Sequence, residues 1–139
     1  MGMYTEFVYA IDLRENTPQE VIDLLNYMTN TGDNCDEIEI PKHELFGDTR
    51  WRHMLKCDSA YFLGKSSVHF SKYSYMNEYN LTVRTNFKNY DDEITLFLDW
   101  IKPYVSACCD EFLGYYRYEE DIDPTLIYWD GLKHYAKQQ

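Results

Sequence analysis

The chain has 139 residues, of which 45% are hydrophobic and 27% charged, and its formal net charge is -11 at pH 7. This length predicts a single domain over residues 1–139, and the apolar fraction excludes an intrinsically disordered chain. The negative charge disfavours direct binding to nucleic acid and electrostatic attachment to anionic membranes.

A strand and a helix are predicted at the start of the chain. Residues 4–14 alternate between apolar and polar side chains, with Phe7 and Tyr9 on the apolar side, which is typical of a β-strand. Residues 17–20 combine a capping hydroxyl, a proline at the first helical position and a glutamate three residues after the cap. A helix is therefore expected to begin there, and Gly32 is expected to end it.

The middle of the chain is predicted to contain three strands. Residues 33–47 are polar and irregular, and a short helix capped by Asp48 is expected to follow them. Strands are predicted over 59–63, 66–73 and 78–87, with a hairpin between the first two.

The last of these strands carries the clearest alternation in the sequence. Its polar side holds five residues in a row of alternate positions: Asn80, Thr82, Arg84, Asn86 and Lys88. A strand with one polar side indicates a sheet that is covered on one face only.

The C-terminal half is predicted to contain a helix and two further strands. Asp91, Asp92 and Glu93 place carboxylates where the positive end of a helix dipole begins, and Pro103 is expected to end that helix or to kink it. Strands are predicted over 111–119 and 125–129. Residues 132–139 are expected to form a short helix or to fray.

This order of elements indicates an α+β fold, with a single antiparallel or mixed sheet and two main helices on one face. The predicted outline is ferredoxin-like with an extra C-terminal hairpin, and a rearranged α+β topology is the alternative. The residues expected to share one core are Leu24, Leu25, Leu81, Val83, Phe97, Leu98 and Ile101.

Neither a metal site nor a cofactor is predicted. The four cysteines contain no Cys-x-x-Cys pair, and zinc sites need ligands at such short spacings. They are expected to be reduced thiols in a cytoplasmic protein, because the chain begins without a secretory signal and has no apolar run of the ~18–20 residues that a membrane span needs.

The polar face of the sheet is the candidate ligand or partner surface. Strand alternation is expected to place Tyr115 and Arg117 on it beside Arg84 and His69. Such a face is suited to a small anionic ligand, and tyrosines on open sheets also stack on single-stranded nucleic acid. Ordinary cross-strand packing explains the same residues, and six acids over residues 110–123 oppose nucleic acid.

A cluster of acids follows Tyr118, and its members are Glu119, Glu120, Asp121 and Asp123. Clustered carboxylates attract a basic partner over long range, so this cluster is predicted to steer association. Rows of carboxylates also imitate the phosphates of DNA, which makes an acidic DNA mimic an alternative.

The C-terminal half resembles a family of small bacteriophage and prophage proteins of no known function. The resemblance covers about half of the chain and rests on residues 89–93, 100–103 and 114–120. It implies a protein of the host-cell cytoplasm that modulates a host or defence system.

No nucleophile motif, glycine-rich phosphate loop or metal-ligand spacing is present in the sequence. We therefore expect a non-catalytic interaction protein, an acidic modulator or inhibitor whose partner is another protein with a basic surface. A small anionic-ligand binder is the alternative from a different class.

Overall fold

The computed structural model describes residues 4–29, 38–47, 49–89 and 92–138, and these form one antiparallel sheet of seven strands with two α-helices. The strands are β1 (Thr5–Leu13), β2 (Ser67–Lys72), β3 (Tyr79–Phe87), β4 (Val105–Ser106), β5 (Glu111–Tyr118), β6 (Thr125–Trp129) and β7 (His134–Gln138). Their order across the sheet is β2-β3-β1-β5-β6-β7, and the short β4 pairs with β1.

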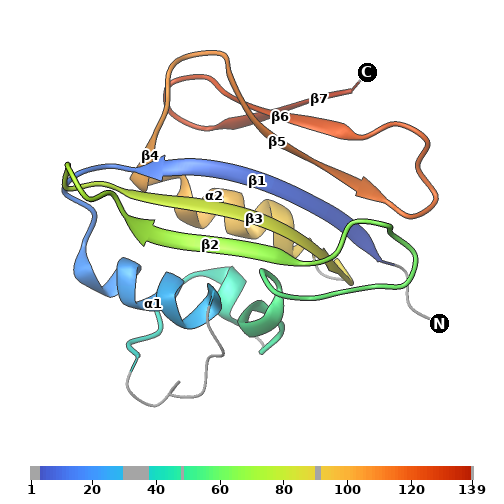
Figure 1. Ribbon diagram of the computed structural model, residues 1–139, viewed down its shortest axis with the longest axis horizontal. Coiled ribbons are helices and arrows are strands. Elements are labelled where there is room, and N and C mark those ends of the chain that lie inside the picture. The colour runs from blue at the N-terminus through green and yellow to red at the C-terminus, as the bar shows by residue number, and fades with distance from the viewer. Residues whose placement is uncertain (1–3, 30–37, 48, 90–91, 139) are drawn as a thin grey trace.

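The helices α1 (Gln19–Thr29) and α2 (Glu93–Ile101) leave one face of the sheet uncovered. Figure 1 shows α2 behind β1 and β3, so the viewer looks on to the face without helices, which we call the open face. The order β5-β1-β3-β2, with one helix after β1 and one after β3, is ferredoxin-like. The hairpin β6–β7 extends the sheet beyond β5, and the predicted fold class is thereby confirmed.

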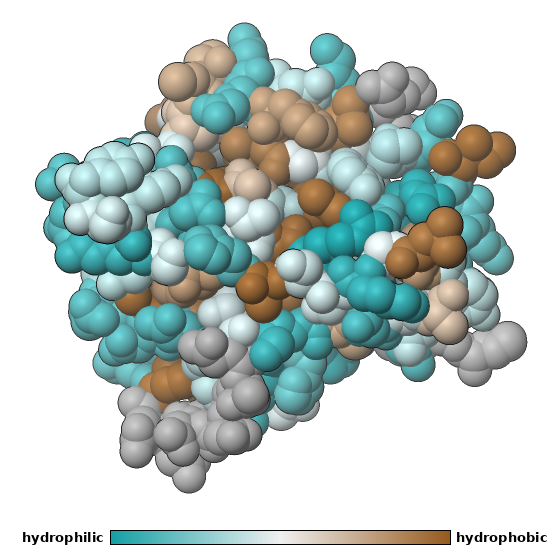
Figure 2. Space-filling model, in the orientation of Figure 1, coloured by the Kyte–Doolittle hydropathy of each residue, from teal (hydrophilic) through white to brown (hydrophobic). Residues whose placement is uncertain are grey.

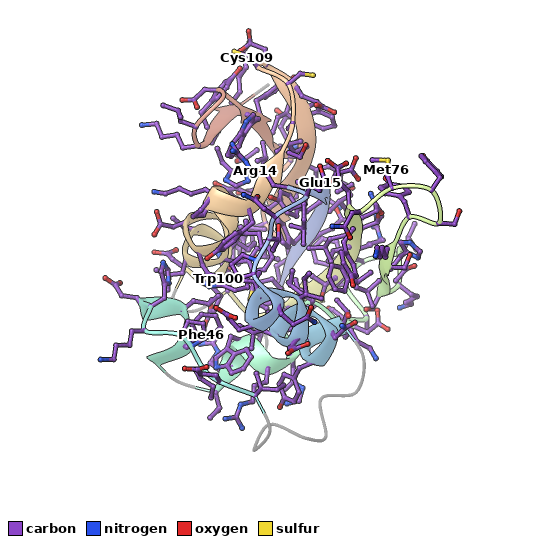
Figure 3. The ribbon with its side chains drawn as sticks, turned by 90° about the vertical axis from the view of Figure 1, so that its left-hand side faces the viewer. Arg14, Glu15, Phe46, Met76, Trp100 and Cys109 are labelled. Carbon is purple, nitrogen blue, oxygen red and sulfur yellow. The ribbon has the colours of Figure 1, made fainter. Side chains whose placement is uncertain are left out.

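The core lies between the sheet and the helices. The ring of Phe97 on α2 contacts two aromatic rings of β1, with centroids 6.3 Å from Phe7 and 6.0 Å from Tyr9. Trp100 packs edge-on against Phe46, with centroids 5.4 Å apart, on the helix side of the molecule (Figure 3). Of the predicted core, only Leu98 is not fully buried, although it packs against the core.

Two predicted elements are wrong. Residues 59–63 form turns instead of a strand, and within them Tyr61 N donates a hydrogen bond to Ser59 Oγ at 3.1 Å. The ends of this loop are held by long-range bonds: Ser66 N donates to Asp58 Oδ1 at 2.6 Å, and Asn86 Nδ2 donates to Gly64 O at 2.8 Å. The expected hairpin at residues 64–65 is therefore absent. The C-terminal tail is the strand β7 and not a helix, since it pairs with β6 from Trp129↔His134 onward.

The helix ends differ from the predictions in detail. Thr17 Oγ1 donates to Arg14 O at 2.6 Å, and α1 begins at Gln19. At the start of α2, Asn89 Oδ1 accepts from Ile94 N at 3.1 Å. The helix ends at Ile101, two residues before Pro103, as expected.

Other predicted helix ends, at Gly32, Asp48 and Asp91, lie outside the described residues. The predicted short helix is a 3-10 turn over Arg50–His53 with Trp51 buried.

Among the helices that the structure describes, none has the length and apolar character to cross a bilayer.

Candidate functional site

The register of the sheet places all four predicted site residues on the open face. Tyr115 lies opposite Val8, which lies opposite Arg84 on the next strand. Arg117 lies opposite Glu6, and His69 lies opposite Thr82. Alternation along β2, β3 and β5 is therefore sufficient to bring these residues to one surface.

The two arginines of this set are held by one carboxylate. Glu6 is only 3% exposed, and it forms an ion pair with Arg84 and a second with Arg117, whose Nε lies 3.4 Å from Glu6 Oε1. A buried carboxylate is stable only when it is paired, so both guanidinium groups stabilise the buried carboxylate of Glu6.

A loop over residues 58–66 covers this end of the open face. The Arg117 guanidinium lies 5.1 Å from the centre of the Phe62 ring, and Phe62 itself is buried. Gly64 abuts Arg84, so that a Cβ at Gly64 would overlap the guanidinium. The prediction of a sheet covered on one face only therefore fails here, because the segment predicted as a strand folds over the polar side of β3 and buries Asn86.

The rest of the open face contains a groove with a volume of about 460 Å³. Val8, Ala10, Phe112 and Tyr115 line it, and Tyr73 borders it at the end of β2. Figure 2 shows hydrophobic and near-neutral residues along the middle of this face, with hydrophilic residues around them. In Figure 3, Met76 marks the tip of the β2–β3 hairpin, which projects to the side opposite α2.

Two carboxylates of the groove are held by neutral donors. Asp12 Oδ1 accepts hydrogen bonds from Tyr73 Oη at 2.7 Å and from Asn80 Nδ2 at 3.0 Å. Glu111 Oε1 accepts from Cys108 N at 2.9 Å. The bond to the Asp12 carboxylate raises the pKa of Tyr73. Of the described residues that line the groove, none is Lys, Arg or His, so no cation in its lining offsets these two charges.

A row of aromatic rings continues the groove across β5, β6 and β7. The ring centroids of Phe112 and Tyr128 are 5.4 Å apart, and those of Tyr128 and Tyr135 are 5.6 Å apart with nearly parallel planes. Tyr135 Oη donates to Asp110 Oδ1 at 2.9 Å, which raises the pKa of Tyr135. This row was missed by sequence reasoning, because it exists only when residues 134–138 are a strand.

The other predicted residues lie outside the groove. His69 is on the edge strand β2, where its Nε2 lies 2.8 Å from Ser71 Oγ. The acidic steering cluster follows β5, at the opposite end of that strand from Glu111. Its first member, Glu119, accepts a hydrogen bond from Tyr4 N at 2.5 Å.

A pair of titratable groups, the buried Tyr9 and the half-buried His134, lies on the other face of the sheet. Tyr9 Oη and His134 Nε2 are 2.7 Å apart, and the His134 ring also bonds the backbone carbonyl of Leu98. Burial lowers the pKa of His134 from 6.5 to about 4, with Lys102 adding to the effect, and raises that of Tyr9. The imidazole is therefore neutral at pH 7.

Within the described ranges, no three His, Cys, Asp or Glu side chains are grouped so that they could hold a metal ion. Comparison of the chain with protein-family models, with curated proteins and with solved structures found no match. The function is therefore inferred from the geometry of the open face.

Proposed function

We propose that the protein is a non-catalytic interaction protein that binds a basic segment of another protein in the groove of the open face. The observation that carries this proposal is the combination, in one uncovered groove, of aromatic side chains with two fixed carboxylates and no lining cation among the described residues.

The aromatic lining supports a protein partner. Phe112 is 50% exposed, and Tyr115 and Tyr128 are half-buried beside it. Tyrosine and phenylalanine offer a large contact area with few rotatable bonds, which makes them effective anchors of protein interfaces. The residues packed beside these rings limit their motion, so binding costs less side-chain conformational entropy.

The charge of the groove supports a basic partner. Asp12 and Glu111 are oriented by neutral hydrogen-bond donors, so a Lys or Arg side chain of the partner would meet carboxylates that are already in place. The net charge of -11 is also negative, so it attracts the same basic partner over long range.

The small anionic-ligand binder has less support. It needs Arg84 and Arg117 as free cations, whereas both pair with Glu6 beneath the 58–66 loop. The DNA mimic is likewise weaker, since the acids of the cluster 119–123 are confined to one turn and do not form an extended row.

The resemblance to bacteriophage and prophage proteins implies where the proposed protein would act. A small acidic protein of such a source would act in the cytoplasm of the host cell, as a modulator or inhibitor of a host or defence protein. Its partner would present Lys or Arg next to an apolar side chain.

A displayed library of random peptides, selected on the immobilised protein at physiological salt, tests the proposal. We expect the selected peptides to combine Lys or Arg with aromatic or aliphatic residues. Asp12→Asn combined with Glu111→Gln should weaken their binding about tenfold, because two charge-assisted contacts become neutral. Tyr115→Ala should have an effect of similar size.

The matched control removes two exposed acids of helix α1, through Glu20→Gln with Asp23→Asn. This variant has the same net charge as the groove variant and should bind the peptides within about twofold of the parent. Selection of acidic peptides, or equal loss in both double variants, would contradict the proposal.

A further inference from the structure

A second cavity lies on the opposite side of the sheet from the groove. It has a volume of about 230 Å³ and lies between the last turns of α2 and the strands β5, β6 and β7. Leu98, Tyr116, Ile127 and Ala136 form its apolar walls. Figure 1 shows that these strands continue beyond α2, so the helix leaves this part of the sheet uncovered.

The floor of this cavity is polar but already satisfied. His134 lines it, and both ring nitrogens are in use, one with Tyr9 Oη at 2.7 Å and the other with the carbonyl of Leu98. The ring also packs edge-on against Trp129, with centroids 5.0 Å apart. The imidazole is consequently rigid and neutral, and a ligand has no hydrogen bond to gain from it.

The remaining polar groups of the cavity carry an excess of positive charge. Lys102 and Lys133 both line it, and Asp99 is the one carboxylate among its described lining residues. Asp99 is shared between Lys102 Nζ at 2.7 Å and His43 Nε2 at 2.9 Å. Lys133 is exposed and forms no ion pair within the described part of the chain.

From this arrangement we infer that the cavity binds a small monocarboxylic acid with an apolar body. The body packs between Leu98, Tyr116 and Ile127, and the carboxylate lies at Lys133 and Lys102. The volume lies below the ~300–1,000 Å³ of pockets for drug-sized ligands, so the ligand is smaller than a drug-sized molecule. Apolar walls with a few convergent polar groups are the usual composition of such sites.

Benzoate is the probe that tests this inference, with the uncharged benzamide as its matched control. Titration is followed by the fluorescence of the tryptophans, since Trp129 contacts the floor of the cavity, and by NMR shifts of Ile127 and Ala136. We expect saturable binding of benzoate and binding of benzamide that is weaker by about tenfold, because only the carboxylate pairs with an ammonium group.

Three variants locate the site. Lys133→Met should weaken benzoate about tenfold, and Ala136→Phe should abolish binding by filling the cavity. Lys137→Met should have no effect, because Lys137 lies on β7 over the Tyr128 ring, on the open face. If Ala136→Phe does not fold, the comparison of Lys133→Met with Lys137→Met decides.

Absence of saturable benzoate binding at millimolar probe concentrations would overturn the inference, as would equal binding of benzoate and benzamide or equal losses in the two lysine variants. The test is independent of the proposed partner groove. The combination of Asp12→Asn with Glu111→Gln alters the opposite face, and it should leave the affinity for benzoate unchanged.

Discussion

The carboxylate of Glu6, on the central strand, is ion-paired with Arg84 on the neighbouring strand at a depth where Glu6 is only 3% exposed. Arg117, on the strand at the other side of the central strand, forms a second ion pair with Glu6. These contacts divide the open face into a closed end, under the 58–66 loop, and an open end that holds the groove.

Closure of that end depends on the missing side chain of Gly64. Gly64→Ala should lower the free energy of unfolding by about 1–3 kcal/mol, because the new methyl group overlaps the Arg84 guanidinium, and moving that group disturbs its ion pair with the buried Glu6. Gly47→Ala is the control, since a Cβ there meets nothing within 4 Å, and it should change stability by less than about 1 kcal/mol. Urea denaturation measures both, and equal effects would show that the loop does not pack as described.

The two faces of β3 should respond differently to the same substitution. Leu81 is fully buried, so Leu81→Asp places an unpaired charge in the core and should cost about 4 kcal/mol or more. Thr82, its neighbour, is exposed on the open face, and Thr82→Asp should cost about 1 kcal/mol or less. If Leu81→Asp melts within a degree or two of the parent, the faces of the sheet are assigned the wrong way round.

Acid should destabilise the fold through His134. The pKa of His134 is about 4 in the folded protein and near 6.5 in the unfolded chain. Between these values the unfolded chain binds more protons, so stability falls as the pH is lowered from about 6.5 to about 4 and this contribution is then constant below pH 4.

The comparison with His134→Gln isolates this effect, because glutamine retains an acceptor for Tyr9 and does not titrate. The difference in melting temperature between parent and variant should change over that pH window. A difference that is constant from pH 7 to pH 4 would mean that His134 is not buried as a neutral group.

The acidic steering cluster should act only at low salt. Its first member, Glu119, lies eight positions after Glu111 along β5, which is roughly 26 Å at about 3.3 Å per residue. That distance exceeds the Debye length of about 8 Å at physiological ionic strength and is close to the ~30 Å at 0.01 M.

Neutralising Glu119, Glu120, Asp121 and Asp123 together should therefore slow association with a basic partner at 0.01 M salt and have little effect at 0.15 M. Asp12→Asn should weaken binding at both, because it removes a direct contact. Surface plasmon resonance at the two salt concentrations measures the rates. An effect of the cluster that survives physiological salt would place the partner nearer to the β5–β6 turn.

Local patterns predicted most of the fold but not the limits of the candidate site. Alternation in β1, β3 and β5 was strong enough to assign faces correctly, and this placed His69, Arg84, Tyr115 and Arg117 on one surface. The pairing of both arginines with Glu6 was not predictable, because it joins residues that are distant in the chain. The same holds for Asn86, whose long-range bond to Gly64 fixes the covering loop.

The C-terminal strand was missed for a related reason. Residues 134–138 are too few for a distinct periodic signal, and their strand conformation depends on pairing with β6. With β7 in place, Tyr135 joins the aromatic row on the open face, and His134 reaches Tyr9 on the other.

Mapping of NMR chemical-shift changes, on addition of the tightest basic peptide from the library selection, tests the central claim most directly. The account predicts the largest backbone shifts at Val8, Ala10, Asp12, Phe112 and Tyr115, with small shifts along α1 and α2. Largest shifts on the helices, or at residues 119–123 alone, would contradict binding in the groove of the open face.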